Sequence, residues 1–347
     1  MQIKKIELMN FRNHKKREVS FLPGVNFLCG ANAKGKTNIL EAICFFATTK
    51  SFRTSKDATC ILDGEQAAKA KILVERPFGN VELCLELDKT QKKSFFVNGE
   101  KMHSPSKVLG NFCAVLFSPD EMKIAKGGPE ERRNFLDNAI SELSGAYYDL
   151  LLRFEKVLFQ RNLLLKRGAS DLEIEVWDEQ FAALSEKILR QRQVFVDKIA
   201  PLAKANTKFL SGEKETLEVA YESAFKNHSK EDILAILGAN RLRDRELGYT
   251  SVGPHRDDLI LSVEGKDLKT HGSQGQQRTA VLALKLAAYE VFEQTLGEPP
   301  VLLLDDVFSE LDPKRAKLLF DKVRCGQTII TGTRARAASF SYNKIKL

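Results

Sequence analysis

The sequence lacks the cysteine spacing of a metal-binding or disulfide-linked protein. Its six cysteines include no C-x-x-C pair and have no nearby histidines, which argues against a zinc site and a disulfide framework. No apolar run approaches the roughly 18 residues that a membrane-spanning helix needs, and the first residues lack the apolar segment of a secretion signal. We therefore expect a cytoplasmic protein with no membrane partner and with core thiols at Cys29, Cys44, Cys60, Cys84, Cys113 and Cys325.

The sequence does have the composition of a large globular protein with an excess of basic residues. Its 347 residues are 43% hydrophobic and 29% charged, which suits a large core and about two domains. The formal charge of +8 and the pI near 9.0 indicate a polyanionic partner or, more simply, a solvated basic surface. Basic side chains gather near both ends of the chain and after residue 49.

One segment near the N-terminus fits the P-loop pattern of nucleotide-binding proteins. An apolar, strand-like run over 25–28 precedes it, and a helical pattern begins at Thr37. In a P-loop, backbone N–H groups face the β-phosphate, Lys36 reaches the β and γ oxygens, and the Thr37 hydroxyl ligates Mg²⁺. The flanking strand and helix disfavour the alternative, a turn without a ligand. The pattern predicts ATP and Mg²⁺ as cofactors and occupies Gly30, Ala31, Asn32, Ala33, Lys34, Gly35, Lys36 and Thr37.

A second segment, far along the chain, supplies carboxylates suited to phosphoryl transfer. The apolar run over 301–304 ends in Asp305 and Asp306, as a buried parallel strand does when its carboxyl end borders a site. We expect Asp305 to hold Mg²⁺ through water and Asp306 to position the attacking water. The other interpretation is a strand that runs into a helix N-terminus. The residues that follow complete a predicted parallel-sheet nucleotide domain: a loop with Asp312 as N-cap, a helix over 314–323 and a strand over 327–331.

A third segment opens a long helical pattern at Ser273. Serine and glycine at a helix start can act simply as a cap. Because the segment lies just before the carboxylate-ended strand, it also resembles the signature motif of ABC ATPases, whose serine hydroxyl and helix N-terminal amides bind the γ-phosphate of a nucleotide held by a second subunit. ATP would then join two copies, and hydrolysis would release them. The residues that would contact the partner's nucleotide are Ser273, Gln274, Gly275 and Gln276, and the helix's apolar face carries Val281, Leu284, Ala288 and Phe292.

The distance from the P-loop to the signature segment indicates an inserted domain. Ser273 lies 237 residues after Lys36, much further than in the ATPase subunit of a transporter. Apolar spacing predicts one helical stretch over 130–166 and a second over 171–210 that Pro201 interrupts. These stretches would form an antiparallel arm on the order of 45–55 Å long, or a compact subdomain folded on the head.

The expected fold class is α/β. We expect an ABC-type P-loop ATPase head with a mixed sheet flanked by helices, formed by residues 1–118 and 241–347. The inserted α-helical domain would comprise residues 119–240. The inserted domain and the late signature segment count against a membrane-docked transporter subunit, and they leave open a nucleotide-gated protein scaffold.

Over essentially its whole length the sequence resembles the RecF family, recombination and gap-repair ATPases related to SMC proteins. Two runs indicate this family in particular, because neither is a general phosphate-binding motif: Lys50-Ser51-Phe52-Arg53 and Gly253-Pro254-His255-Arg256-Asp257-Asp258. The resemblance also rests on the three segments above and on Asn10-Phe11-Arg12-Asn13, Gly35-Lys36-Thr37-Asn38, Phe117-Ser118-Pro119-Asp120, Gly127 to Asp137, and Asp305 to Asp312.

The resemblance implies a homodimer that, with ATP bound, clamps double-stranded DNA near single-strand gaps and, with RecR and RecO, helps to load RecA. It also places Arg12, Asn13 and Asn38 at the nucleotide, although a surface arginine at a hairpin end is an equal alternative for Arg12. We expect contact with the DNA backbone and little base preference, because no recognition-helix motif is present. Candidate DNA contacts are Lys15, Lys16, Arg17, Arg53 and Lys56.

A few positions depart from the family and superfamily patterns. Ala33 stands where the family usually has glycine, and Ser118-Pro119-Asp120 where ABC ATPases place a glutamine. Residues 331–334 replace a switch histidine, and Asp306 replaces the more usual glutamate. These departures predict slow, weak ATP hydrolysis that acts as a timer. The resemblance implies that DNA stimulates this hydrolysis.

Two of the family-specific runs also have simpler structural interpretations. Arg53 can be a helix-terminal cation that pairs with the helix dipole. Arg256 and Asp257 are expected to form an internal ion pair, and His255 to be hydrogen-bonded and not catalytic.

Overall fold

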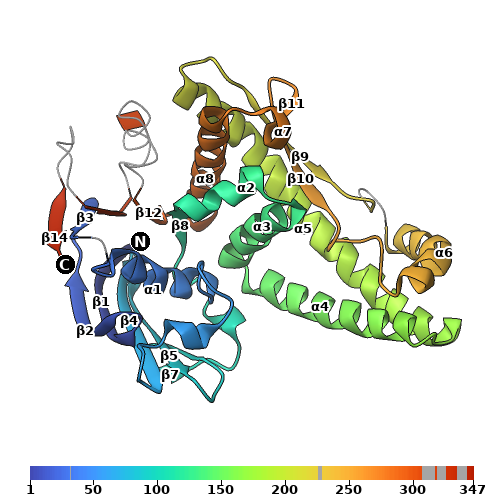
Figure 1. The fold of residues 1–347 in the computed structure, drawn as a ribbon, viewed down its shortest axis with the longest axis horizontal. Helices are drawn as coiled ribbons and strands as arrows, with labels where there is room; N and C mark the ends of the chain where they lie inside the picture. The colour runs from blue at the N-terminus through green and yellow to red at the C-terminus, as the bar shows by residue number, and fades with distance from the viewer. Residues whose placement is uncertain (32, 226–228, 307–316, 319–325, 334–341) are drawn as a thin grey trace.

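Three β-sheets and a group of long helices make up the described part of the chain in the computed structural model (Figure 1). The structure describes residues 1–31, 33–225, 229–306, 317–318, 326–333 and 342–347. Several sequence-based expectations therefore fall wholly or mainly outside the described residues: those on Asn32, on Cys325, on residue 334, on the loop capped by Asp312, and on the helix over 314–323.

The largest sheet is antiparallel, with the strand order β2-β1-β4-β5-β6-β7. Residues alternate along β1 and β4, so that Ile6 and Ile72 are fully or almost fully buried. On the other face, opposite charges lie across neighbouring strands, as in the Lys69–Glu86 pair at 2.8 Å. The strands are β1 Gln2–Phe11, β2 His14–Ser20, β4 Ala67–Arg76, β5 Gly79–Asp88, β6 Ser94–Val97 and β7 Glu100–Lys101.

A second sheet carries the nucleotide-type segments and is entirely parallel, with the order β14-β3-β13-β12-β8. Every residue of β8, β12 and β13 is buried. Strands that are buried on both faces are mostly apolar along their length, which is the pattern predicted for a parallel sheet. The predicted strands and the α/β class are thus confirmed, with the parallel and antiparallel strands in separate sheets. The strands are β3 Val25–Cys29, β8 Ala114–Phe117, β12 Val301–Leu304, β13 Thr328–Gly332 and β14 Asn343–Lys346.

The third sheet, with the order β11-β10-β9, lies among the helices, and β9 packs on α5. Its strands are β9 Leu217–Glu222, β10 Asp258–Val263 and β11 Lys266–Asp267. The shorter helices around the sheets are α1 Lys36–Thr48, α2 Lys123–Lys126, α3 Pro129–Leu143 and α7 Leu268–His271, with 3₁₀ turns at Asp57–Cys60, Pro105–Lys107 and Pro119–Met122.

Helix α8, Gln274–Leu296, confirms the helix predicted after the signature segment. The four residues expected on its apolar face, Val281, Leu284, Ala288 and Phe292, are all buried. Part of this burial comes from α5, which packs along α8. The signature segment therefore sits at the start of a helix that the core holds firmly.

The helical stretch predicted over 130–166 is wrong in one respect, because it is two helices. Helix α3 ends at Leu143, and α4 spans Gly145–Lys166. Ser144 between them has extended backbone angles, φ −145° and ψ 99°, and its hydroxyl accepts from the Tyr147 N–H at 3.3 Å. A side chain that caps the next helix has therefore replaced a continuous helical turn.

The interruption expected at Pro201 is also wrong. Helix α5 runs unbroken over Asp171–Ser211, 41 residues, with Pro201 inside it. A proline in a helix removes one hydrogen bond and crowds the preceding turn. Here Pro201 is exposed while the neighbouring turns contribute Ile199 and Ala203 to the core, so packing against α8 offsets the local cost.

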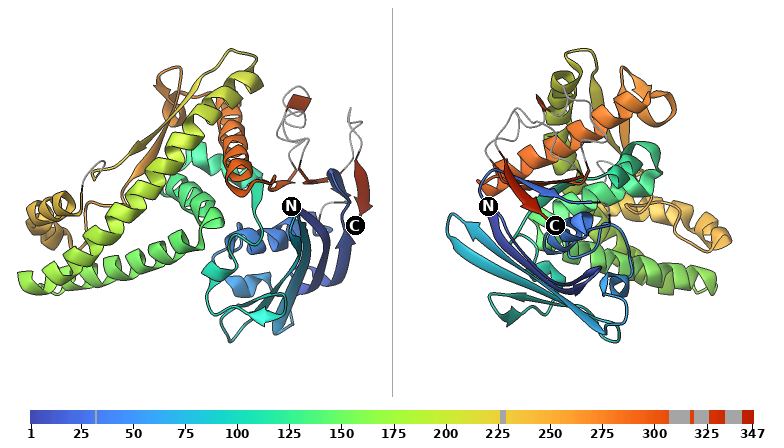
Figure 2. Two further views of the ribbon diagram at one scale, coloured as in Figure 1. Left: turned by 180° about the vertical axis from the view of Figure 1, so that it is seen from behind. Right: turned by 60° about the vertical axis from the view of Figure 1, so that its left-hand side comes forward.

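Helices α4 and α5 extend away from the two larger sheets, and α6, Lys230–Leu247, lies near their distal end (Figure 2). At about 1.5 Å per residue, α4 and α5 are about 33 and 62 Å long. The distal end has a small core of its own, formed by Leu164, Leu165, Ala169 and Ile174. The boundary proposed at residue 240 falls inside α6. None of the helices in the described part of the chain is both long and apolar enough to cross a membrane.

The Gly253–Asp258 run lies at a buried ionic junction between α3, α5 and β10. Arg192 of α5 donates to Asp137 of α3 at 2.8 and 2.9 Å and to the Pro254 carbonyl at 2.7 Å. The expected Arg256–Asp257 pair is wrong, because Asp257 lies 3.5 Å from Arg192 while Arg256 stacks 4.9 Å from the Tyr249 ring centroid.

The expectation that His255 is hydrogen-bonded agrees with the structure. His255 is bonded to the Thr250 carbonyl at 3.0 Å, and burial lowers the pKa of its imidazole to about 4. The five cysteines in the described part of the chain are buried free thiols, also as expected.

Candidate nucleotide-binding site

The P-loop pattern connects β3 to α1 and has the backbone shape that a phosphate-binding loop requires. Gly35 precedes the helix with φ 84°, a left-handed conformation that favours glycine. Lys36 then begins α1, and its Nζ donates to the carbonyl oxygens of Gly30 at 2.8 Å and Ala31 at 2.9 Å. The ammonium group thus lies across the start of the loop, next to the helix N-terminus, where an anion is stabilised.

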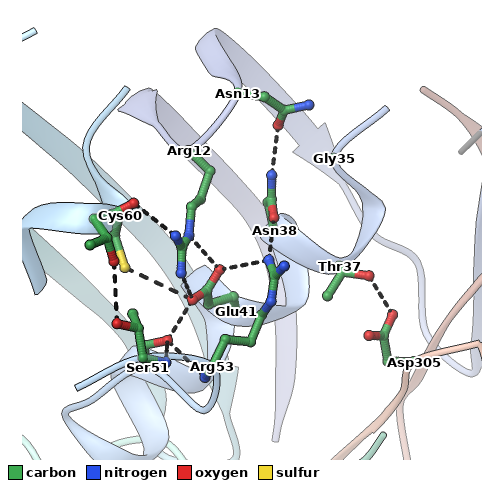
Figure 3. Close-up of polar contacts among 12 residues, drawn as sticks. Arg12, Asn13, Gly35, Thr37, Asn38, Glu41, Ser51, Arg53, Cys60 and Asp305 are labelled. Carbon is green, nitrogen blue, oxygen red and sulfur yellow. Dashed lines mark hydrogen bonds and ion pairs between the residues drawn. The ribbon is translucent and has the colours of Figure 1, made fainter. Parts of the chain in front are cut away.

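The structure brings the P-loop and the carboxylate-ended strand together. Thr37 Oγ1 donates to Asp305 Oδ1 at 2.9 Å, although 268 residues separate them in sequence (Figure 3). Thr331, at the end of the adjacent strand β13, also donates to Asp305 Oδ1, at 2.6 Å. Its hydroxyl oxygen accepts from the Asp306 backbone N–H at 2.9 Å. Sequence reasoning treated Thr331 as a strand end and as part of a departure from a pattern, and it missed this bridge between the two aspartates.

Asp305 and Asp306 differ in exposure, as two different roles would require. Asp305 is 6% exposed and is held by two hydroxyl groups, whereas Asp306 is exposed and has φ 50°. Ser118 follows β8, whose Phe117 carbonyl accepts from the Asp305 N–H at 2.9 Å. The carboxyl ends of β8, β12 and β13 therefore meet at one sheet edge, beside the P-loop.

A fully buried carboxylate, Glu41 of α1, organises the residues beside the loop. Arg12 donates to both of its oxygens, at 2.8 Å from Nε and through a second, shorter contact from Nη2. Arg53 lies 3.4 Å away, and the Ser51 hydroxyl donates at 2.5 Å (Figure 3). Glu41 also raises the pKa of Arg12 above its usual value through hydrogen bonding and charge. Sequence reasoning missed Glu41, because a glutamate in a helix normally indicates an exposed face.

This cluster gives Arg12 and Arg53 defined partners. Arg12 is neither an isolated surface arginine nor free, since its side chain is 18% exposed and also bonds the Thr59 carbonyl at 2.7 Å. Arg53 donates to Asn38 Oδ1 at 2.8 Å instead of pairing only with a helix dipole. Asn38 in turn donates to Asn13 at 2.8 Å. The Lys50–Arg53 run thus braces α1 and the β1–β2 turn.

The signature segment has the cap geometry expected of a helix start. Ser273 is the N-cap of α8, where its hydroxyl accepts from the Gln276 N–H at 3.2 Å and its own N–H donates to Gln276 Oε1 at 2.9 Å. Ser273 and Gln274 are exposed, and a Cβ at Gly275 would meet only Ser273 Oγ, at 3.9 Å. Ser273 therefore caps α8, and the N-terminus of the helix is also open to solvent.

Arg53, one of the five candidate DNA contacts, bonds Asn38 of the P-loop helix, while the other four lie on β2 or follow the Lys50–Arg53 run. Lys15, Lys16 and Arg17 lie on β2, an edge strand, with both lysines exposed. Lys56 is exposed after the Lys50–Arg53 run. Within the described residues, none of these four side chains forms an ion pair, which leaves their charges available to a polyanion.

Comparison with known proteins gives close similarities along nearly the whole chain. The family model described as RecF/RecN/SMC N terminal domain matches residues 2–345. The DNA replication and repair protein RecF of Alkaliphilus oremlandii is 42% identical over 341 residues, covering 96% of this chain and 93% of that protein. That of Clostridium novyi is 40% identical over 336 residues with the same coverage.

Solved structures show the same similarity in three dimensions. A structure of the recombination mediator protein RecF-ATPrS in the RecFOR pathway superposes with a TM-score of 0.91 at 35% identity, covering 99% of this chain and 96% of that one. An Smc head bound to the C-terminal winged-helix domain of ScpA shares the fold, with a TM-score of 0.55 at 18% identity. By fold and by sequence along nearly its full length, the chain belongs to the RecF family of SMC-related ATPases.

Proposed function

We propose that this protein binds ATP together with Mg²⁺ and uses the nucleotide to control its grip on DNA. The observation that carries the proposal is the 2.9 Å contact between Thr37 Oγ1 and Asp305 Oδ1, at the start of the helix whose first residue is Lys36. A hydroxyl at the start of a P-loop helix and an aspartate at a strand end are the two protein ligands that P-loop ATPases supply to a nucleotide-bound magnesium. That relatives were solved as RecF-ATP and RecF-ATPrS supports the same nucleotide here.

The oxygen atoms of Thr37 and Asp305 are suitable ligands for Mg²⁺. Magnesium prefers oxygen ligands and is usually held by one or two protein groups together with substrate phosphates. No group of three or more His, Cys, Asp or Glu side chains that could hold a metal occurs among the described residues, so a cage made by protein alone is not expected there. Bound magnesium would neutralise charge that develops on the phosphate oxygens.

The residues themselves would share the rest of the hydrolysis reaction. Lys36 would withdraw from the carbonyl groups of Gly30 and Ala31 to contact the β and γ oxygens. Asp306, exposed at the strand end beside Asp305, would orient the attacking water. Because Asp306 is one methylene shorter than glutamate and no glutamine follows β8, we expect slow hydrolysis that times release of DNA.

The exposed start of α8 favours a dimer in which each copy completes the other's site. Ser273 and the free amides of the first turn would face the γ-phosphate held by the P-loop of the second copy. Two heads joined in this way would bind double-stranded DNA near single-strand gaps through phosphate contacts. They would act with RecR and RecO to load RecA, which fits the relatives' description as replication and repair proteins of the RecFOR pathway.

Sedimentation with ATP, Mg²⁺ and a gapped duplex tests this proposal. The wild type should form an ATP-dependent dimer that loads on DNA, and Ser273→Arg should keep ATP binding but remain monomeric. Ser170→Arg is the matched control, because Ser170 is also an N-cap in a capping box, at the start of α5. Loss of either cap costs about 1 kcal/mol, so only a nucleotide contact distinguishes the two variants.

Three outcomes would count against the proposal in different ways. A Ser273→Arg protein that still dimerises excludes completion of the site by the second copy. A wild type that dimerises without affinity for DNA favours a nucleotide-gated scaffold. If Lys36→Met leaves ATP affinity undiminished, the P-loop is not the ATP-binding site.

A further inference from the structure

Two side chains from the turn that begins β2 contact carbonyl groups of the P-loop. Asn13 Nδ2 donates to the Ala33 carbonyl at 2.9 Å, and His14 Nε2 lies 3.1 Å from the Gly35 carbonyl. His14 is 6% exposed, and burial lowers its pKa, so the imidazole is neutral near pH 7. A carbonyl oxygen only accepts, so the proton of His14 must lie on Nε2.

Both carbonyl groups belong to residues with left-handed backbone. Ala33 has φ 65° and Gly35 has φ 84°. The conformation is easy for glycine and costly for alanine, whose Cβ approaches the following carbonyl oxygen. Ala33 therefore needs support that glycine would not need.

The turn also explains why residue 35 cannot carry a side chain. A Cβ there would lie 2.3 Å from His14 Nε2 and 2.4 Å from Asn13 Oδ1. The loop and the β1–β2 turn are thus packed directly against each other. The Asn13 side chain is held in place by a further bond, because its Oδ1 accepts from Asn38 Nδ2 at 2.8 Å.

We propose that Asn13 and His14 are positioning residues for the phosphate-binding loop. They bind the carbonyl groups of Ala33 and Gly35 from outside, which turns the loop's N–H groups toward the phosphates and stabilises the left-handed conformation at Ala33. Asn13 then acts through the loop and not by contact with the nucleotide. The inference rests on the proposed binding of ATP, because the loop's geometry matters only if phosphate is its ligand.

A double-mutant cycle between Asn13 and Ala33 separates the two roles. Asn13→Ala should weaken ATP affinity about tenfold, the value of one hydrogen bond. In an Ala33→Gly background the same change should weaken affinity no more than about twofold, because glycine holds the left-handed conformation without support. An equal loss in both backgrounds would show a direct contact with the nucleotide and overturn the inference.

His14 provides an independent arm of the test. His14→Gln keeps an N–H donor and should retain most of the ATP affinity, whereas His14→Phe fills the space without a donor and should lose about tenfold. Equal losses in the two variants would mean that packing, and not the bond to Gly35, matters. Asn98→Ala is the control, since Asn98 also has positive φ, 50°, and bonds a backbone N–H, but at the turn between β6 and β7.

Hydrogen exchange in the nucleotide-free protein tests the loop independently of ATP. Exchange of the amides at residues 33–36 should be faster in Asn13→Ala than in the wild type and should stay unchanged in Asn98→Ala. Unchanged exchange in Asn13→Ala would overturn the positioning role. If the wild type binds no ATP but the exchange rates change as expected, the proposed function fails and the structural role of Asn13 stands.

Discussion

The buried Glu41 cluster gives a quantitative prediction for the region that supports the P-loop helix. Arg12→Ala removes the main partner of a carboxylate that is fully buried, and breaking a buried pair in this way costs about 3–5 kcal/mol. Glu41→Gln should cost less, about 1–3 kcal/mol. The reason is that Arg12 is 18% exposed and keeps its bond to the Thr59 carbonyl, so water can solvate its charge.

The two changes should not be additive. In the double variant no buried carboxylate remains unpaired, so its cost should fall below the sum of the single costs by about 2 kcal/mol. Denaturant unfolding followed by circular dichroism measures all three values. The exposed pair Lys69–Glu86, subjected to Lys69→Ala and Glu86→Gln, serves as the control and should change stability by less than about 1 kcal/mol.

Additive costs for Arg12 and Glu41 would refute this reasoning. The same variants also decide the open question about Arg12. If Arg12→Ala weakens ATP affinity at a temperature where the fold is intact while Glu41→Gln does not, the guanidinium contacts the nucleotide in addition to its structural pair.

Further predictions concern hydrolysis, pH and DNA. Asp306→Asn should keep ATP affinity, slow phosphate release and retain the dimer on DNA in a turnover assay; normal turnover would exclude Asp306 as the water-positioning group. Burial raises the pKa of Glu142 to about 8, so the stability that its protonated form contributes is complete below its ordinary pKa of 4.5 and is lost as pH rises through 8. Glu142→Gln should remove that part of the pH dependence and unfold at a higher temperature than the wild type above pH 8, and an unchanged pH profile would contradict the assignment. Reversal of Lys15, Lys16 and Arg17 to Glu should weaken DNA binding and reduce the magnitude of its salt slope by up to about 3, whereas an unchanged slope would assign β2 to solubility.

Local patterns in the sequence were sufficient for the elements that bear the site. The strand before the P-loop, the strand before Asp305 and the helix after Ser273 each lie within one residue of the predicted position. Each has a signal that needs no knowledge of distant residues: a continuous apolar run for a strand buried on both faces, and a cap followed by three-to-four spacing for a helix. The same signals failed at Ser144, where a side-chain cap begins a second helix, and at Pro201, where packing of α5 against α8 offsets the cost of the proline.

The sequence by itself determined which chemical groups are candidates for binding a nucleotide, because a P-loop and a carboxylate-ended strand are each recognised from a short run of residues. Only the tertiary structure decided how those groups are held. Asp305 meets Thr37 and Thr331 because three parallel strands end at one edge, and no local pattern encodes the order of strands in a sheet. Glu41, Asn13 and His14 have partners that packing brings to them, at separations that a linear pattern does not reveal.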